Sequence, residues 1–218
     1  MSAGQLLLAD ERERVAAVCR QIGRSGLVTA AAGNVSARIG DQAVITPRGC
    51  RLSVATPEEI VVLALNGEHV DGTREASSET GIHLGVYAGT DAGGVVHTHS
   101  HFATVLSTLV DAVPPIHYSI AGLGGVVRVA GYATFGSEEL AEHAIAGLEG
   151  RYAVLLRNHG AVTIGPTVEI AMERAFTLEW LCSLAYHARL YGTPTLVSEE
   201  ELERVREQSR RLDYGLDP

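Results

Sequence analysis

Residues 93–102 read GGVVHTHSHF and place three of the nine histidines of the chain at alternating positions. Alternate side chains on a β-strand point to one face of the sheet, so His97, His99 and His101 would present their imidazoles on the same side. Two imidazoles at positions i and i+2 of a rigid strand can bind one metal ion. A polar strand end with solvated histidines is the alternative, and ligands elsewhere in the chain decide between the two.

The composition is that of an ordinary soluble globular protein. The chain has 218 residues, of which 46% are hydrophobic and 20% charged, so it can bury a substantial core. Its formal net charge of −9 argues against a general surface for nucleic acid or anionic membranes. Any phosphate that it binds must therefore be held by a local pocket.

The cysteines and the N-terminus predict a cytoplasmic protein. Cys19, Cys50 and Cys182 are far apart and odd in number, which fits a reducing compartment. After three leucines the N-terminal segment becomes densely charged, which is typical of neither a signal peptide nor a membrane span. No other run approaches the ~18 apolar residues that a membrane helix requires.

Helices and strands alternate along the chain without a linker-like segment. A single α/β domain over residues 1–218 is therefore expected, with residues from about 198 to 218 as a C-terminal helix and mobile tail. The predicted helices cover residues 9–26, 77–89, 102–109, 138–148, 167–190 and 199–212. The predicted strands cover residues 34–39, 42–47, 61–65, 68–70 and 93–99, two runs within 152–165, and short pieces between residues 113 and 136.

Several residues are suited to capping the predicted helices. Asp10 is predicted to cap the first helix, and Gly26 to end it. Thr56 precedes a proline and begins a short helical turn. Ser137 and Thr167 begin two later helices.

Two further residues could complete a metal site with His97 and His99. His159 lies at a polar break between two apolar strands in LLRNHGAVTIG, and Glu79 lies in ASSETG. The alternatives are an ordinary strand histidine and an acid in the first turn of a helix, where the helix dipole favours it. Three imidazoles and one carboxylate are a donor set that suits Zn²⁺.

Four fixed protein ligands would close the coordination shell of the metal, and a closed site cannot activate a substrate. Catalysis therefore requires that one ligand leave. The carboxylate of Glu79 is the natural candidate. Once displaced by substrate oxygens, it becomes a base beside the metal.

Three stretches are suited to binding an oxyanion. AAGNVS places Gly33 and Asn34 in a tight turn, and Ser77 and Ser78 offer hydroxyl and N–H groups at a helix N-terminus. The loop TPRG adds a cation, Arg48. Each feature is common by itself. Together they favour an oxyanion site, because Ser77 and Ser78 directly precede Glu79, the predicted carboxylate ligand.

The motifs GNVS, ITPRG, SSE, VVHTHS, IHYSIAG, YATFG, NHG and DYGL occur in an order that resembles the class II aldolase/adducin family. The match extends from about residue 10 to residue 216. The resemblance implies a three-layer α/β/α domain around a mostly antiparallel sheet, assembled as a C4 homotetramer with active sites at subunit interfaces. The implied activity is reversible cleavage of a ketose 1-phosphate, L-fuculose 1-phosphate or a 5-deoxypentulose relative, to dihydroxyacetone phosphate and a small aldehyde.

The resemblance also implies a ligand set and a phosphate site. One Zn²⁺ per subunit, or Mn²⁺ or Co²⁺ in its place, would be held by Glu79, His97, His99 and His159. The substrate phosphate would be bound by Gly33, Asn34, Gly49, Ser77 and Ser78.

Four residues receive further roles by the same resemblance. Glu79 would be the acid/base for the proton on the dihydroxyacetone phosphate carbon. Tyr118 would come from the neighbouring subunit as the acid for the aldehyde oxygen. Phe135 would help to wall the aldehyde pocket, and Tyr214, in a mobile C-terminal segment, would close over the substrate. Arg48 departs from the family pattern, because close relatives carry a small hydroxyl residue there.

The chain contains no lysine, since all 17 of its basic residues are arginines. A class I aldolase, which forms a Schiff base through a lysine, is therefore excluded. A metal ion can instead stabilise the ene-diolate that carbon–carbon cleavage leaves.

Other members of the same superfamily remain alternatives. A sugar-phosphate 4-epimerase typically has Asp where this chain has Glu79, whereas dehydratases and decarboxylases share the His-x-His pair. A non-catalytic adducin-like binding module is disfavoured by the intact ligand set. His101 is interpreted as a polar residue at a helix start, and His83 and His117 as core or interface residues.

Overall fold

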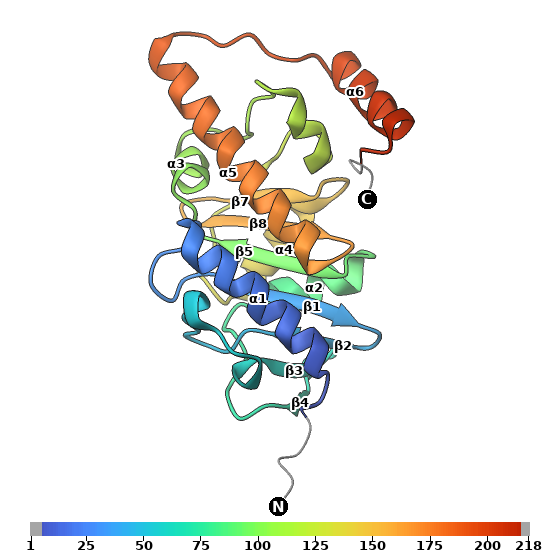
Figure 1. Cartoon of the computed structure of the whole chain (residues 1–218). Coiled ribbons are helices and arrows are strands. Elements are labelled where there is room, and N and C mark those ends of the chain that lie inside the picture. Colours follow the sequence, from blue (N-terminus) through green and yellow to red (C-terminus); the bar gives the residue numbers. More distant parts are fainter. Residues whose placement is uncertain (1–5, 215–218) are drawn as a thin grey trace, which may run out of the picture.

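The computed structural model describes residues 6–214 and contains one eight-stranded sheet with the order β4-β3-β2-β1-β5-β8-β7-β6 (Figure 1). All neighbouring strands are antiparallel except β6 and β7. The prediction of a mostly antiparallel sheet is confirmed. The strands are β1 Asn34–Ile39, β2 Gln42–Ile45, β3 Val61–Ala64, β4 His69–Asp71, β5 Gly94–Thr98, β6 Val129–Ala130, β7 Ala153–Leu156 and β8 Gly160–Gly165.

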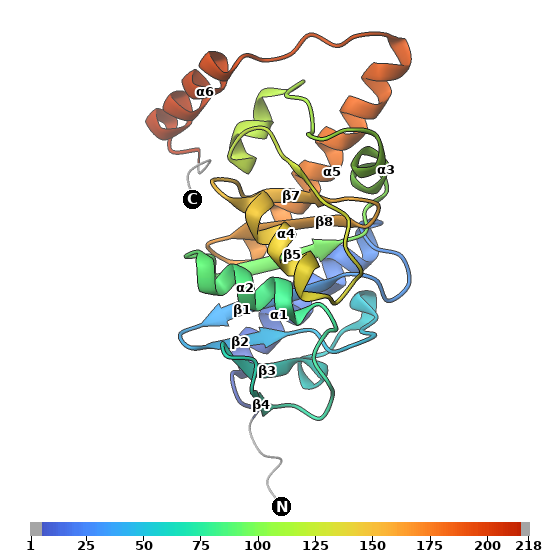
Figure 2. The ribbon, with the colours of Figure 1, turned by 180° about the vertical axis from the view of Figure 1, so that it is seen from behind.

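Helices cover both faces of the sheet, so the predicted three-layer α/β/α architecture is confirmed. Helices α1 and α5 lie on the face that Figure 1 presents, and α2 and α4 lie on the face that Figure 2 presents. The helices are α1 Ala9–Ser25, α2 Thr80–Gly89, α3 His101–Leu109, α4 Glu138–Leu148, α5 Val168–Tyr191 and α6 Glu199–Leu212, with short 3-10 turns η1 Leu52–Val54, η2 Pro57–Glu59 and η3 Tyr118–Leu123.

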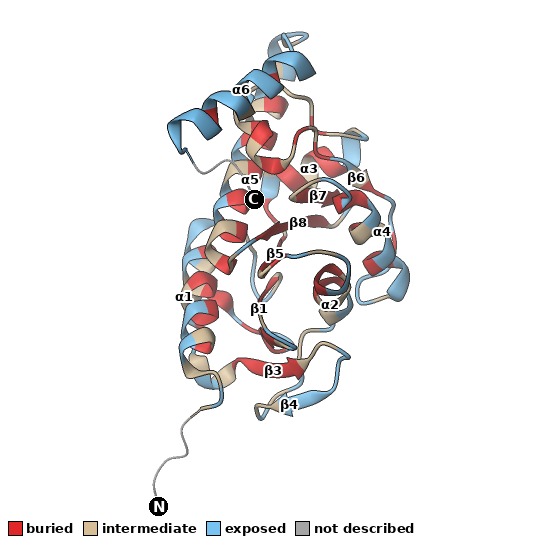
Figure 3. Ribbon diagram, turned by 90° about the vertical axis from the view of Figure 1, so that its right-hand side faces the viewer, coloured by how far each residue is buried: buried red, intermediate tan, exposed pale blue. Residues whose placement is uncertain are grey.

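The apolar core is divided into layers by the sheet. One large cluster packs α1 and α5 against the sheet, and a second packs α2 and α4 against its other face. The central strands β5 and β8 are buried along their whole length, and the helices turn their buried residues inward (Figure 3). Because both faces of these strands are buried, their sequences are nearly continuous apolar runs rather than alternations of apolar and polar residues.

Most of the predicted caps are confirmed. Gly26 follows α1 with a φ of 85°, a conformation that favours glycine. Thr56 forms a capping box with Glu59 at η2. The side chain of Ser137 accepts a hydrogen bond from the N–H of Leu140, and that of Thr167 caps α5 in the same way.

One predicted helix cap and one predicted helix start are wrong. Helix α1 begins at Ala9, with Leu8 at the cap position, so Asp10 lies in the first turn and makes no cap. Its charge is still favoured there by the helix dipole. Helix α2 begins at Thr80 rather than at Ser77, because the N–H of Ser77 donates to the carbonyl of Thr46.

The glycine- and proline-rich middle of the chain forms less strand than predicted. Between residues 113 and 136 the only strand is the two-residue β6, and the turn η3 takes the place of other strand-like pieces. Helix α6 follows α5 through an extended segment and packs against η3 (Figure 1). The tail predicted beyond α6 lies mostly outside the described residues.

Within residues 6–214, no helix is both long enough and apolar enough to cross a lipid bilayer. This includes α5, which has 24 residues but is not apolar enough to span a membrane.

The buried guanidinium of Arg12 ties α1 to the edge of the sheet. Its side chain is fully buried and donates hydrogen bonds to the carbonyls of Leu7 and Ile60 and to the carboxylate of Asp71. Asp71 lies on the edge strand β4 and is partly exposed. One arginine therefore satisfies backbone acceptors that otherwise have no access to water.

We expect Arg12→Ala to lower the free energy of unfolding by about 2–4 kcal/mol, because it leaves buried carbonyls unbonded and opens a cavity. Arg14→Ala is the matched control, since Arg14 belongs to the same helix and forms an exposed ion pair with Glu169. The control should lose less than about 1 kcal/mol. Urea denaturation measures both values, and equal losses would contradict the role given to Arg12.

Candidate metal centre and active site

The four predicted metal ligands lie close together at one end of the central strands β5 and β8. His97 lies on β5, and His99 lies one residue beyond the end of that strand. His159 occupies the turn between β7 and β8, and Glu79 directly precedes α2. One ligand atom from each residue lies within 4.8 Å of every other.

The orientation of His97 follows from its hydrogen bonds. Its Nδ1 lies 2.9 Å from the carbonyl oxygen of Ala161, which can only accept, so Nδ1 carries a hydrogen. In a neutral ring the Nε2 lone pair then points away, toward the other three residues. Nε2 of His97 lies 3.0 Å from Nε2 of His99 and 3.2 Å from Oε2 of Glu79.

The carboxylate of Glu79 is incompletely satisfied. Oε2 accepts a hydrogen bond of 2.9 Å from the amide of Asn34. Oε1, 3.4 Å from Nε2 of His159, is the single buried side-chain oxygen or nitrogen within residues 6–214 that has no hydrogen-bond partner. Such an atom costs free energy unless something binds it. A cation between this oxygen and the three imidazoles satisfies all four groups, so the residues fit a divalent metal ion.

The protonation states of the cluster agree with metal binding. Burial acts to raise the pKa of Glu79, but the adjacent imidazoles of His97 and His159 and the amide of Asn34 outweigh it and hold that pKa well below its usual range. Burial, followed by the neighbouring imidazoles, lowers the pKa of His99 to about 3. The same causes lower the pKa of His159. At neutral pH the cluster therefore offers the ionised carboxylate of Glu79 and the neutral imidazoles of His99 and His159, which are the forms that bind metals.

The predicted phosphate residues line the same small cavity as three of the four predicted ligands. Its volume is about 120 Å³. It is lined by Gly33, Asn34, Gly49, Ser77, Ser78, Phe135 and Arg48, together with Glu79, His99, His159 and a few neighbours. The structure thus brings together residues that are up to 126 positions apart in the sequence, from Gly33 to His159.

Close backbone contacts explain two glycines of the site. Gly33 has a φ of 83°, and a Cβ atom there would lie 2.8 Å from the carbonyl oxygen of His97. A Cβ atom on Gly160 would lie 2.2 Å from the carbonyl oxygen of Thr98. A side chain at either position would push the backbone that carries His97 or His159 out of place.

Arg48 lies at the rim of the cavity with an exposed side chain. Its guanidinium forms an ion pair of 2.6 Å with Glu75, which satisfies part of its hydrogen-bonding capacity. Phe135 is also at the rim and is 68% exposed. Both side chains could contact a bound ligand without moving buried neighbours.

Tyr118 and Tyr214 are not part of this cavity. They line a separate cavity of about 660 Å³ between η3 and α6. Tyr118 is 53% exposed and Tyr214 is 73% exposed. Within one chain these tyrosines are therefore remote from the ligand cluster, and their roles in it stay a prediction that requires a second chain.

Sequence reasoning gave no role to the residues behind the site. His83 is fully buried, and its Nε2 contacts the amide oxygen of Asn34 at 2.5 Å. Ser36 and Tyr87 continue the contact into the core. Glu79, His83 and Tyr87 are spaced four residues apart, which predicts that they lie along one face of a helix, but this spacing does not indicate their partners Asn34 and Ser36 on β1.

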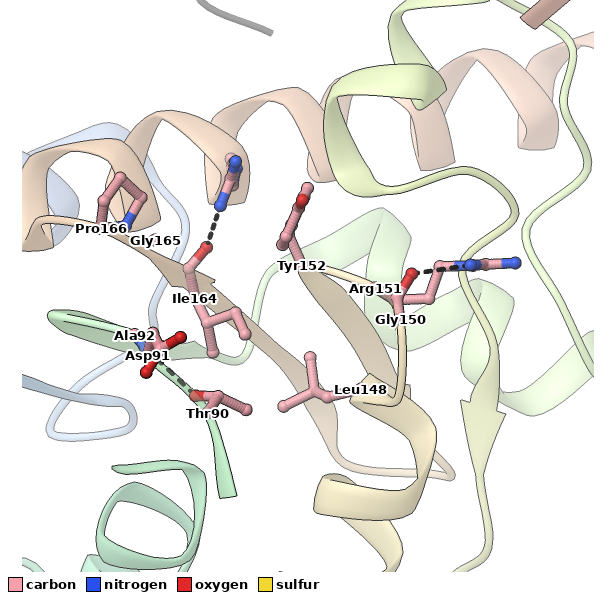
Figure 4. Close-up of a pocket in the computed structure, with 11 residues that line it drawn as sticks. Thr90, Asp91, Ala92, Leu148, Gly150, Arg151, Tyr152, Ile164, Gly165 and Pro166 are labelled. Carbon is pink, nitrogen blue, oxygen red and sulfur yellow. Dashed lines mark hydrogen bonds between the residues drawn. The ribbon is translucent and has the colours of Figure 1, made fainter. Parts of the chain in front are cut away.

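A larger cavity of about 420 Å³ lies at the opposite ends of β5 and β8 (Figure 4). The figure shows Ile164 and Tyr152 in its wall. Arg174 of α5 also lines the cavity and contacts both residues. Arg174 donates to the carbonyl of Ile164 at 2.7 Å and lies 3.9 Å from the centre of the Tyr152 ring. Asp91 and Arg151 also line this cavity, which contains none of the four predicted metal ligands.

Comparison with known proteins places this geometry in a family. Residues 13–186 match the model of the class II aldolase and adducin N-terminal domain. The 5-methylthioribulose-1-phosphate/5-deoxyribulose-1-phosphate aldolase of Rhodospirillum rubrum is 39% identical over 90% of this chain and 88% of its own. The L-fuculose phosphate aldolase of Escherichia coli K12 is 38% identical over 91% of this chain and 92% of its own.

A solved structure supports the same relationship. An L-fuculose 1-phosphate aldolase superposes with a TM-score of 0.90 and 33% sequence identity, covering 94% of this chain and 98% of the other. The predictions of this family, of its fold and of an enzyme of the aldolase type are confirmed. The chain belongs to the class II aldolase and adducin family.

Proposed function

We propose that this chain is a divalent-metal-dependent aldolase that reversibly cleaves a ketose 1-phosphate to dihydroxyacetone phosphate and a small aldehyde. The observation that carries the proposal is the cavity in which a carboxylate and imidazoles adjoin a loop suited to phosphate. An aldolase that acts on a ketose 1-phosphate and has no lysine for a Schiff base uses a metal ion to stabilise the ene-diolate, and it needs a place for the phosphate.

The metal ion would be held by Glu79, His97, His99 and His159. Three ring nitrogens and one carboxylate favour Zn²⁺, with Mn²⁺ or Co²⁺ as other ions that accept such ligands. When bound, the ion supplies a Lewis acid for the carbonyl and hydroxyl oxygens of the sugar.

The phosphate would be bound by the loops at the mouth of the cavity. Gly33 and Gly49 both have positive φ, so their backbone turns sharply where the cavity begins. The hydroxyls of Ser77 and Ser78 and the amide of Asn34 line the same space. Small residues and hydroxyl donors let a phosphate approach the backbone closely.

Glu79 would move the proton at the carbon next to the carbonyl. In the direction of synthesis, a C–H bond of dihydroxyacetone phosphate breaks, its electron pair stays on the substrate as an ene-diolate, and the proton goes to Oε1 of Glu79. That oxygen has no hydrogen-bond donor of its own. In the direction of cleavage the same proton returns to carbon.

Tyr118 of a neighbouring subunit would act on the aldehyde oxygen, as the acid in synthesis and the base in cleavage. Exposed Tyr118 and Tyr214 lie together around their own cavity, which contains none of the metal ligands. A C4 homotetramer that seats this region against the ligand cluster of the next subunit would complete the site. Tyr214 would then close over the substrate and Phe135 would border the aldehyde.

The sugar is proposed to be a ketose 1-phosphate with a short or apolar group at its far end. The relatives are named for L-fuculose phosphate and for 5-deoxy- and 5-methylthio-ribulose 1-phosphates. Exposed Phe135 offers an apolar surface at the rim. We also propose a cytoplasmic location, which the three buried free thiols of Cys19, Cys50 and Cys182 support.

A panel of ketose 1-phosphates, assayed for release of dihydroxyacetone phosphate, tests the reaction itself. We expect cleavage of at least one sugar of the panel, and a much lower kcat/KM for the same sugar without its phosphate, because binding of the phosphate positions the reacting carbons. Comparable kcat/KM for the two forms would contradict the phosphate site. A pentulose 5-phosphate is included for comparison, and its epimerisation without cleavage of any ketose 1-phosphate would favour an epimerase instead.

Metal analysis tests the ligand set. We expect one divalent ion per chain, and loss of most of it in His97→Ala and in His159→Ala. His101→Ala is the control, because His101 continues the alternating spacing but is exposed at the start of α3. Chelation should abolish activity and lower the melting temperature, since the ion binds only the folded chain. Full activity after complete chelation would overturn the metal-dependent mechanism.

Mixing of inactive variants tests the division of roles between Glu79 and Tyr118. Glu79→Gln should abolish cleavage and also the exchange of the dihydroxyacetone phosphate proton with solvent. Tyr118→Phe should reduce cleavage but retain this exchange. Each loss should be about 10²–10⁴-fold, as for other acid–base residues. Hybrid tetramers of the two variants should recover activity, and hybrids that stay inactive despite proven subunit exchange would refute the shared site.

A further inference from the structure

A chain of four buried polar side chains runs from the carboxylate of Glu79 into the core. Asn34 donates its amide N–H to Oε2 of Glu79 at 2.9 Å, and the amide oxygen of Asn34 lies 2.5 Å from Nε2 of His83. Nδ1 of His83 lies 2.6 Å from the hydroxyl of Ser36, which lies 2.6 Å from the hydroxyl of Tyr87. Strand β1 supplies Asn34 and Ser36, and helix α2 supplies the others. None of the four is more than 4% exposed.

The amide of Asn34 determines the first half of this chain. Its NH₂ group faces Oε2 of Glu79 and donates to it, so its amide oxygen faces Nε2 of His83. Nε2 of His83 must then carry a hydrogen, because the amide oxygen cannot donate one. In the reverse orientation the amide oxygen of Asn34 would face Oε2 of Glu79, and these two buried hydrogen-bond acceptors would repel each other.

The second half follows from the neutral state of His83. Burial lowers the pKa of His83 to about 3, so a ring with hydrogen on Nε2 has a lone pair on Nδ1. Ser36 must donate its single hydrogen to that lone pair, and the hydroxyl of Tyr87 must donate to Ser36. Every hydrogen bond thus runs in one direction, from Tyr87 toward Glu79. One set of hydrogen positions satisfies the whole chain.

We infer that Ser36 and His83 are positioning residues for the active site, which fix the amide of Asn34 on Oε2 of Glu79 and so leave Oε1 as the oxygen for the metal ion and the proton. Only the part of the inference that concerns the proton rests on the proposed function. The part that concerns the orientation of the carboxylate and the binding of the metal ion does not depend on it.

The arrangement explains the two unlike oxygens of Glu79. Oε2 has a permanent donor in Asn34, whereas Oε1 has none and faces His159. Without Ser36 the imidazole of His83 is free to place its hydrogen on Nδ1. Its Nε2 lone pair would then repel the amide oxygen of Asn34, and the amide would lose its fixed orientation. Glu79 would keep its charge but lose its alignment.

The direct test is the tautomer of His83. In protein labelled with ¹⁵N-histidine, at pH 7.5 and free of metal, we expect hydrogen on Nε2 and a bare lone pair on Nδ1. The His83→Gln spectrum assigns the signal. A ring with hydrogen on Nδ1, or a doubly protonated ring, would overturn the inference whatever reaction the enzyme catalyses.

The functional test is the affinity for Zn²⁺, measured by competition with a chelator. Ser36→Ala and His83→Leu should weaken it about 10–100-fold, the usual effect of losing a residue that orients a ligand. His83→Gln should restore part of the loss, because its amide can still donate toward Asn34. Thr163→Val is the control, since Thr163 is a buried hydroxyl of β8 that bonds the carbonyl of Ala171 instead.

The outcomes separate this inference from the proposed function. Unchanged affinity in Ser36→Ala, or an equal loss in Thr163→Val, would show a merely structural role and overturn the inference. If the affinities change as expected while no ketose 1-phosphate of the panel is cleaved, the positioning role stands and the proposed reaction fails. Melting temperatures of all variants confirm that the metal affinities refer to folded protein.

Discussion

The carboxylate of Glu79 is buried beside three imidazoles, and the rest of the site depends on how that charge is compensated. Removing an ionised carboxylate from water costs several kcal/mol, and a single amide donor recovers only part of this. Oε1 has no donor among the described residues. A divalent cation is the group that compensates the carboxylate and uses the lone pairs of the imidazoles at the same time.

The pairing of strands β1, β5 and β8 brings Asn34 and His97 together in the site. In the antiparallel register, Asn34 of β1 lies opposite His97 of β5, and His97 lies opposite Val162 of β8. A slip of one residue would turn His97 to the other face of the sheet. Gly160 allows β8 to pack closely against the end of β5, and Gly94 allows the start of α5 to pack closely against β5, because a Cβ atom at either would overlap neighbouring backbone. The chemistry of the site is therefore set by the pairing of the sheet.

Much of the fold was predictable because its signals are local. Apolar runs, turn residues and caps such as Ser137 and Thr167 act over a few residues, and the structure agrees with them. The start of α2 was not predictable in this way, because it depends on the hydrogen bond of Ser77 to Thr46, which joins segments far apart in the sequence. Asp10 failed as a cap because the helix begins at the residue before it.

The site shows the same division between local and distant signals. Ligand types and the His-x-His spacing were readable from the chain, and Glu79 and His159 gather with them as predicted. The unsatisfied oxygen and the buried chain through His83 depend on packing between β1 and α2, which no local pattern states. The role predicted for Tyr118 requires a second chain, so the structure of one chain does not test it.

Anomalous diffraction at the zinc absorption edge is the most direct measurement of the central claim, that these four residues are a metal centre. In crystals of protein loaded with Zn²⁺, the account predicts one strong peak per chain, in contact with one nitrogen each of His97, His99 and His159 and with Oε1 of Glu79. A peak bound elsewhere, or a cluster that stays free of metal at saturating Zn²⁺, would contradict it.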